Sequence, residues 1–234
     1  MIRTFAMLGF WALVVPFAAL VGFPWTLLTG EIDLLYWLGT RIAWAGVRLA
    51  GVKVKVVGLD RLDPQRTYIF MSNHASNLDP PILVPLIPRR TSVLVKRELF
   101  RIPILGRAMR LGSLVPVDRS NRDNAIASLR AAANVLAQGV NMTIFVEGTR
   151  SPDGRLLPFK RGPFHLAMES GTPVAPVTIA GTHNLMPKRR WSLRPGTATV
   201  TFHQPIDPTQ VSDREELMAV VREQIQRALP EEFS

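Results

Sequence analysis

The polar segment around His74 contains residue types that could carry out proton transfer. It reads Asn73-His74-Ala75-Ser76-Asn77-Leu78-Asp79 and directly follows an apolar stretch, residues 68–71, that is typical of a buried β-strand. A carboxylate that keeps one imidazole nitrogen protonated leaves the other free to take a proton from a hydroxyl, so such a His can act as a general base. Residues five positions apart diverge by about 140° on a helix, so pairing of His74 with Asp79 requires a non-helical turn.

The residues that follow Asp79 favour this turn. Pro80 disfavours a helical conformation at Asp79, and Pro80-Pro81 suits the first turn of a helix that continues through Ile82. We therefore expect Asp79 to be the N-cap of this helix, with its carboxylate folded back on His74. Taken alone, a His and an Asp at this spacing more often form a structural hydrogen bond, so the pair needs support from other segments.

A second polar turn follows another predicted strand. The end of the strand and the turn read Phe145-Val146-Glu147-Gly148-Thr149-Arg150-Ser151. Backbone amides around Gly148, the Thr149 hydroxyl and the Arg150 guanidinium are groups that can hold a phosphate. The alternative interpretation is a surface ion pair between Glu147 and Arg150. The turn therefore predicts an anion site only in combination with its neighbours.

A third segment, residues 112–119, contains another predicted strand, and the polar pair Asp118-Arg119 follows that strand. If the three strands run parallel, these three segments meet at one edge of the sheet, where α/β proteins form ligand sites. Alternation and β-branched residues predict strands at 52–56, 68–71, 92–95, 114–117, 143–146, 174–177 and 197–202. Helices are predicted at 123–138 and, opened by a capping box at Ser212-Asp213-Arg214-Glu215, through Leu229. Interleaved strands and helices predict an α/β fold with a mixed, largely parallel sheet flanked by helices.

The first 50 residues differ from the rest of the chain in their charge and hydrophobicity. No charged residue occurs in residues 4–30, a stretch longer than the roughly 20 residues that span a membrane and than the h-region of a signal peptide. Pro16 and Pro24 interrupt this stretch, so insertion into one leaflet competes with a full span. Residues 34–49 place Arg41 and Arg48 on one face among Trp and Leu, as in an interfacial helix. We predict a membrane-anchoring helical pair at 1–50 and a catalytic domain at 51–234; a buried helical hairpin is the alternative.

Composition excludes several classes of protein. The chain has 234 residues, of which 47% are apolar, with no cysteine and a net charge of +10. Disorder, a disulfide framework, a Cys-ligated zinc site and a Cys nucleophile are therefore excluded or disfavoured. Residues 88–123 contain nine Lys or Arg residues and only three Asp or Glu residues. Beside an apolar N-terminus, and without a zinc-finger or aromatic RNP motif, this charge favours anionic lipid over nucleic acid as the partner.

Four segments together resemble the glycerolipid acyltransferase superfamily, and most closely its bacterial 1-acyl-sn-glycerol-3-phosphate acyltransferases. The H-x-x-x-x-D block matches His74 to Asp79, the G-x-x-x-P-V-D-R block matches residues 112–119, and the F-[VI]-E-G-T-R-S block matches residues 145–151. The P-V-x-P-V block matches residues 173–177, so the blocks occur in family order. One such block is weak, but four in order are specific.

The resemblance implies a role for each matching residue. It makes His74 the general base and Asp79 its orienting partner, with no acyl-enzyme intermediate. It implies that residues of the second and third blocks, and one between the first two blocks, bind the glycerol phosphate acceptor: Lys96, Arg119, Glu147, Gly148, Thr149 and Arg150. No metal is expected, because His165, His183 and His203 lack the spacing of metal ligands.

The implied reaction acylates the sn-2 hydroxyl of 1-acyl-sn-glycerol 3-phosphate, a lysophosphatidic acid, to give phosphatidic acid for phospholipid biosynthesis. The donor would be an acyl thioester of acyl carrier protein or coenzyme A, with no further cofactor. Such a donor implies a catalytic domain on the cytoplasmic side of the inner membrane, where excess Lys and Arg also belong. Acylation of another acceptor, such as a lyso-ornithine lipid, another lysophospholipid or glycerol 3-phosphate, is the alternative; a non-catalytic lipid-binding protein is a more distant one.

Overall fold

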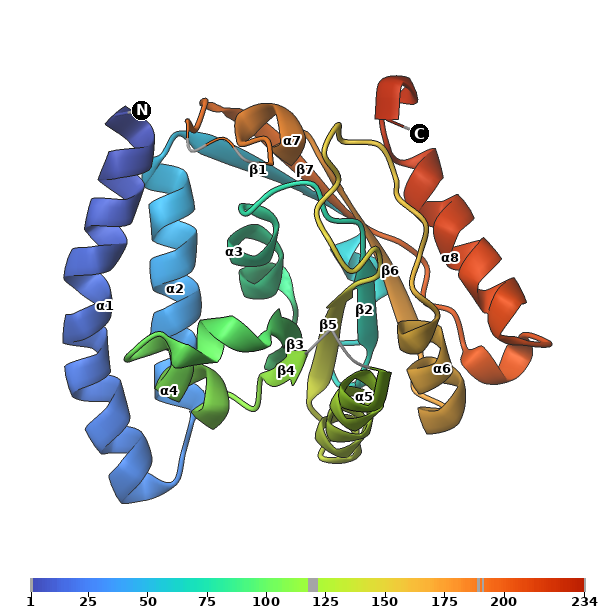
Figure 1. Cartoon of the computed structure of the whole chain (residues 1–234), viewed down its shortest axis with the longest axis horizontal. Helices are drawn as coiled ribbons and strands as arrows, with labels where there is room; N and C mark the ends of the chain where they lie inside the picture. Colours follow the sequence, from blue (N-terminus) through green and yellow to red (C-terminus); the bar gives the residue numbers. More distant parts are fainter. Residues whose placement is uncertain (1, 118–121, 189, 191, 234) are drawn as a thin grey trace.

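A seven-stranded sheet forms the centre of the protein in a computed structural model that describes residues 2–117, 122–188, 190 and 192–233 (Figure 1). Its strand order is β1-β7-β6-β2-β5-β3-β4. The strands are β1 (Val52–Val57), β2 (Ile69–Ser72), β3 (Thr91–Lys96), β4 (Val115–Val117), β5 (Asn141–Phe145), β6 (Val174–Ala180) and β7 (Gly196–Phe202). All seven predicted strands are therefore present, and their ends differ from the predicted ends by a few residues.

The sheet is parallel at every pairing except that of β6 with β7, which is antiparallel. Strand β2 lies between β5 and β6, with Ile69 opposite Met142 on one side and Val174 on the other. The predicted mixed, largely parallel sheet is confirmed. Because β2 and β5 are parallel neighbours, the turns that follow them lie at the same edge.

Helices cover both faces of the sheet (Figure 1). They are α1 (Ile2–Thr29), α2 (Asp33–Leu49), α3 (Asp79–Leu83), α4 (Leu105–Leu111), α5 (Arg122–Ala137), α6 (Arg161–Ser170), α7 (Thr182–Leu185) and α8 (Arg214–Arg227). Short 3₁₀ turns are η1 (Leu59–Arg61), η2 (Val84–Leu86), η3 (Arg97–Arg101), η4 (Pro208–Gln210) and η5 (Glu231–Phe233). Alternating side chains of β2 fill two cores: Phe70 packs with α2 and α3, whereas Ile69 and Met71 pack with α5, α6 and α8.

The two N-terminal helices form an antiparallel pair at one side of the molecule (Figure 1). The indole N–H of Trp11 in α1 donates to the Ile42 carbonyl oxygen in α2 at 3.0 Å. Met7 of α1 enters the core beside Val47 of α2, but most of the α1 side chains are exposed. Among the described residues, α1 alone is long and apolar enough to cross a membrane, judged by length and composition. The predicted helical pair is confirmed, and α1 is not the buried helix of the alternative interpretation.

The N-terminus of α8 corrects one detail of the sequence analysis. The N-cap is Asp213, whose carboxylate accepts the Glu216 backbone N–H at 2.8 Å, and Glu216 in turn accepts the Ser212 N–H. The N-cap is therefore Asp213, one residue later than predicted, and Glu216 bonds to the residue before the cap instead of to the cap's own N–H. Asp caps a helix as well as Ser does.

Candidate active site

The turns that follow β2 and β5 are joined by two hydrogen bonds. Ser72 and Phe145, at the ends of the two strands, are opposite each other in the sheet. Two residues further on, the His74 N–H donates to Glu147 Oε1 at 2.7 Å, and the Ser151 N–H donates to the His74 carbonyl oxygen at 2.7 Å. The predicted meeting of these two polar turns at one sheet edge is therefore what the structure shows.

His74 and Asp79 form a hydrogen-bonded pair within the first turn. His74 Nδ1 lies 2.7 Å from Asp79 Oδ2, and the same oxygen accepts the N–H groups of Ala75 and Ser76. Residues 73–76 have no regular secondary structure and residues 77–78 form a turn, as the pairing requires. The Asp79 side chain is 0% exposed. Its carboxylate is therefore fixed by three donors that precede it in the chain.

Asp79 is not the N-cap that we expected. It is the first residue of α3, and Leu78 occupies the cap position. The carboxylate accepts hydrogen bonds from the turn before the helix instead of from the helix's own first N–H groups. The shift by one residue leaves the functional expectation intact, because the carboxylate still folds back onto His74.

The geometry defines which nitrogen of His74 is basic. A buried carboxylate accepts hydrogen bonds, so Nδ1 carries the proton and Nε2 has the lone pair in the neutral ring. The imidazole stacks on the Phe145 ring, with centroids 4.2 Å apart, which fixes its plane. The His74 side chain is 17% exposed, so Nε2 remains within reach of a substrate hydroxyl. This arrangement is that of a general base.

Glu147 lies behind His74 and is 2% exposed. Its Oε1 accepts the His74 N–H and its Oε2 accepts the Leu157 N–H at 3.1 Å. Burial raises the pKa of the Glu147 carboxyl from 4.5 to about 7, although these two N–H bonds oppose the shift. Both carboxylate oxygens are thus engaged with backbone, which places Glu147 as a support of the His74 turn.

Gly148 follows in a left-handed conformation, with φ of 71°. A Cβ added there would lie 3.1 Å from the Lys160 side chain, so both the backbone and the packing favour glycine. The turn can therefore redirect the chain sharply and bring Thr149 and Arg150 to the mouth of the site.

A pocket of about 820 Å³ opens beside His74. Its polar lining includes Lys96, Thr149 and Arg150, together with the His74 side chain. Apolar residues of α2 and of the segment from η3 to Leu114 form much of the remaining wall, among them Leu35, Gly39, Leu99, Leu105 and Met109. The structure therefore brings four of the predicted site residues to one cavity. Arg119, which we also predicted, lies outside the described residues.

Some contacts of the site were not predicted from the sequence. The Lys188 ammonium donates to the Arg150 carbonyl oxygen at 2.6 Å, and the Ser76 hydroxyl donates to the Met186 carbonyl oxygen at 2.8 Å. The loop after α7 therefore holds both catalytic turns. In the sequence, Lys188 is only one member of a basic run, and nothing near it indicates a contact with a residue 38 positions away.

Comparison with known proteins agrees with this geometry. Residues 53–180, more than half of the chain, match the family described as Acyltransferase. The chain belongs to the acyltransferase family. The matched range contains every predicted site residue, from His74 to Arg150. The resemblance to the glycerolipid acyltransferases is thus confirmed.

Individual relatives of this acyltransferase carry more specific names. A 1-acyl-sn-glycerol-3-phosphate acyltransferase of Limnanthes douglasii is 33% identical over 88% of this chain and 73% of that protein. The alpha form of the same enzyme from Homo sapiens is 33% identical over 68% of this chain and 56% of that protein. The crystal structure of the 1-acyl-sn-glycerophosphate (LPA) acyltransferase PlsC from Thermotoga maritima superposes with a TM-score of 0.84 at 29% identity. That superposition covers 97% of this chain and 92% of the other, so it includes the two N-terminal helices of this acyltransferase.

Proposed function

We propose that this acyltransferase transfers an acyl chain from a thioester of acyl carrier protein or coenzyme A to the sn-2 hydroxyl of 1-acyl-sn-glycerol 3-phosphate, giving phosphatidic acid. The observation that carries the proposal is the His74–Asp79 pair at the wall of an apolar pocket that also contains Lys96 and Arg150. An apolar cavity with a base and cations fits a substrate that has an acyl chain, a hydroxyl and a phosphate. The names of the relatives support the same acceptor.

The reaction follows from the position of the basic nitrogen. His74 Nε2 takes the proton of the acceptor hydroxyl as its oxygen attacks the thioester carbonyl carbon. The tetrahedral oxyanion collapses, the C–S bond breaks, and the imidazolium returns the proton to the thiolate. The products are one ester and one thiol. The negative charge of Asp79, held by its three donors, stabilises the imidazolium that forms between these steps.

Each of the other site residues has a proposed part in binding. Arg150 and Lys96 would hold the acceptor phosphate, because they are cations on the pocket wall, and the Thr149 hydroxyl would add a donor. Glu147 would act through His74, since its two oxygens already accept backbone N–H groups. Gly148 would permit the turn. No cofactor besides the thioester is required by this chemistry.

The contacts of the first helix support an arrangement of the enzyme on a membrane surface. Near the start of α1, the Thr4 hydroxyl accepts the Leu193 N–H at 2.9 Å, and near its end the Phe23 ring lies 5.8 Å from the Arg107 guanidinium. Both ends of α1 are thus held by the catalytic domain, so we propose that α1 lies along one leaflet instead of crossing the bilayer.

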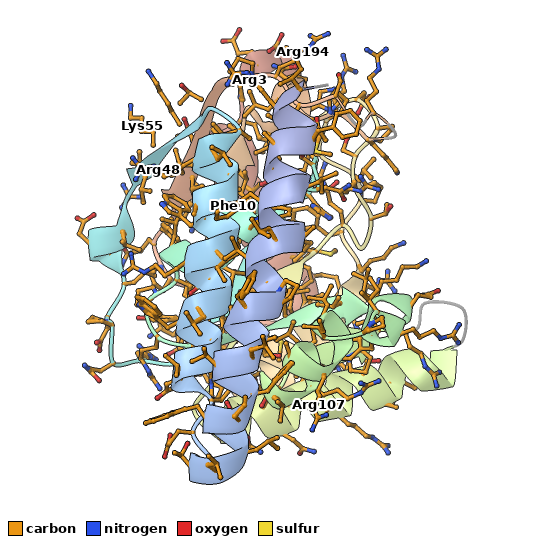
Figure 2. The ribbon with its side chains drawn as sticks, turned by 90° about the vertical axis from the view of Figure 1, so that its left-hand side faces the viewer. Arg3, Phe10, Arg48, Lys55, Arg107 and Arg194 are labelled. Atoms are coloured by element: carbon orange, nitrogen blue, oxygen red, sulfur yellow. The ribbon has the colours of Figure 1, made fainter. Side chains whose placement is uncertain are left out.

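The surroundings of α1 support this placement. Figure 2 looks onto α1 and α2, and cations lie at the edges of this face: Arg3, Arg48, Lys55, Arg107 and Arg194. Cations at the edges of an apolar face favour an anionic leaflet. We infer that the catalytic domain is on the cytoplasmic side of the inner membrane, because soluble thioester donors would be supplied there.

Activity of the purified protein in detergent tests the proposal. Lysophosphatidate and acyl-coenzyme A should give phosphatidate and one equivalent of thiol, and His74→Ala should lower the rate by about 10²-fold or more. His165→Ala is the matched control, because His165 lies on the surface of α6, where it pairs with Glu169. Full activity of His74→Ala would remove the proposed base. A panel of acceptors that includes glycerol 3-phosphate and lyso-ornithine lipid, each offered with both donors, decides the substrate.

A further inference from the structure

The segment that joins η3 to α4 exposes an unusual concentration of large aliphatic side chains. Four of them, each 39–44% exposed, lie within seven residues: Leu99, Ile102, Ile104 and Leu105. Phe100 in the same segment is buried, so the segment has an inner and an outer side. Contiguous apolar patches on a protein surface mark contacts with a membrane or a partner.

The backbone of this segment is fixed and strained. Ile104 has φ of 62° and ψ of −62°, and the Leu105 N–H donates to the Pro103 carbonyl oxygen at 2.6 Å. This geometry is a γ-turn of the rare kind, which is unfavourable for a β-branched residue. A Cβ at Gly106 would collide with the Phe100 carbonyl oxygen, so α4 starts tightly against η3. A strained turn that close packing maintains is characteristic of a functional segment.

This strip, defined as residues 99–105, lies close in the chain to a residue that contacts α1. The guanidinium of Arg107, two residues after the strip, lies 5.8 Å from the ring of Phe23 in α1. Figure 2 shows Arg107 beside the lower part of α1, on the side of the molecule where α1 exposes its apolar residues. The strip and the helix therefore border the same face of the molecule.

The charge around the strip indicates the partner. Residues 96–110 contain five cations, Lys96, Arg97, Arg101, Arg107 and Arg110, and a single acid, Glu98. An apolar strip among cations fits an anionic lipid surface, with aliphatic side chains in the acyl region and cations at the phosphates.

We propose that residues 99–105 are a second membrane-inserting element, which enters the anionic leaflet beside α1. Leu99 and Leu105 are partly exposed and also line the pocket that contains His74. The strip is therefore the boundary between the leaflet and the active site, and a lysolipid passes it to reach His74 without crossing bulk water. This route rests on the proposed function, whereas the insertion itself does not.

The absence of cysteine allows a direct test of insertion. Single-cysteine variants of the full chain would carry an environment-sensitive dye: Ile102→Cys in the strip, Leu20→Cys on the outer face of α1, and Ala219→Cys on α8. Ile102 has ordinary backbone angles, with φ of −70°, and α8 lies on the opposite side of the molecule from α1 (Figure 1). The dyes are observed in detergent and in vesicles that contain phosphatidylglycerol with nitroxide-labelled acyl chains.

We expect a blue shift and nitroxide quenching in vesicles for Ile102→Cys and Leu20→Cys, and neither for Ala219→Cys. Quenching at Leu20 without quenching at Ile102 would overturn the proposal. A shift at Ile102 that depends on protein concentration and not on lipid would also overturn it, because a second copy of the chain would then cover the strip.

An activity measurement tests the route separately. Ile102→Glu combined with Ile104→Glu should lower the rate on long-chain lysophosphatidate in vesicles by about tenfold, equivalent to about 1.4 kcal/mol. The rate on a water-soluble short-chain lysophosphatidate should not change, and Ala219→Glu should leave both rates intact. Equal losses on both acceptors would mean that the substitutions damage the site and would overturn the route. If the parent protein acylates no acceptor, the proposed function fails while the dye measurement still decides insertion.

Discussion

At the carboxyl ends of β2 and β5 polar side chains are buried, whereas along α1 apolar side chains are exposed. Asp79 and Glu147 lie within the protein, at 0% and 2% exposure, and accept five hydrogen bonds from neighbouring groups. Leu20 on α1 is 71% exposed. Buried carboxylates and exposed leucines are both contrary to the usual distribution of polar residues outside and apolar residues inside a protein. Each arrangement is stabilised in a different way.

The two regions obtain their stability in different ways. The buried carboxylates are compensated inside the protein, by backbone N–H groups and the His74 ring, so the catalytic turns are defined without any partner. The outer face of α1 has no such compensation within the described protein, and the lipid phase that we propose around it would remove its apolar surface from water. Substitutions in the two regions should therefore have different effects. We expect loss of activity or of folding in the first region and loss of membrane contact in the second.

Asp79→Asn should produce the largest effect. All three hydrogen bonds converge on Oδ2, so the single oxygen of Asn can accept them and preserve the turn. The negative charge is lost, and we expect kcat to fall by about 10²- to 10⁴-fold because the imidazolium is no longer stabilised. Steady-state kinetics measures the change, and circular dichroism confirms the fold.

Asp60→Asn is the control for this substitution, because Asp60 is exposed on η1. It should leave kcat unchanged. If Asp79→Asn retained a kcat close to that of the parent, the carboxylate would serve only as a geometric support and the catalytic turn would not depend on its charge.

Glu147→Gln should have a smaller effect with a distinctive pH dependence. In the folded protein the pKa of Glu147 is about 7, against an ordinary value of 4.5, so the folded state holds the proton more tightly. The tighter binding of this proton therefore adds to the free energy of unfolding. The contribution is fully present below pH 4.5 and is lost as pH rises through 7, a change of about 3 kcal/mol. The Gln variant lacks this term, so the stabilities of the two proteins should diverge between these pH values.

The same variant should lose about tenfold in kcat, because the Gln amide can accept only one of the two N–H groups with its oxygen, and a misplaced His74 turn costs about 1.4 kcal/mol. Glu223→Gln, on the surface of α8, is the control and should change neither property. Thermal unfolding midpoints from pH 4 to 8 provide the measurement. Identical pH profiles for Glu147→Gln and the parent would show that this carboxyl does not titrate in that range.

The sequence predicts the strands and the two catalytic turns because both signals are local. Period-two alternation identifies β1, and an apolar run followed by a polar turn identifies the ends of β2 and β5. The pairing of His74 with Asp79 could be predicted because they are only five positions apart in the sequence. Their support by Glu147 could not, since it depends on β2 and β5 being neighbours in the sheet.

Other features depend on packing that has no local signal. The contact of Lys188 with Arg150 requires the loop after α7 to return to the site, and the pocket requires α2 to lie opposite α4. The predicted caps at Asp79 and Ser212 were wrong by one residue. Leu78 precedes α3 without a side-chain cap hydrogen bond, and Asp213 is the residue with extended backbone angles that caps α8.

Leu20→Ala should have the smallest effect on folding. Met7 and Leu20 lie on the same helix, but Met7 is 2% exposed and packs in the core, whereas Leu20 faces outward. Met7→Ala should lower the free energy of unfolding in detergent by about 2–5 kcal/mol, and Leu20→Ala should change it by less than about 0.5 kcal/mol. In vesicles Leu20→Ala should instead weaken partitioning, because apolar area is lost from the lipid-facing side. Equal losses of stability for both variants in detergent would show that the outer face of α1 packs against protein, and the contrast between the two regions would fail.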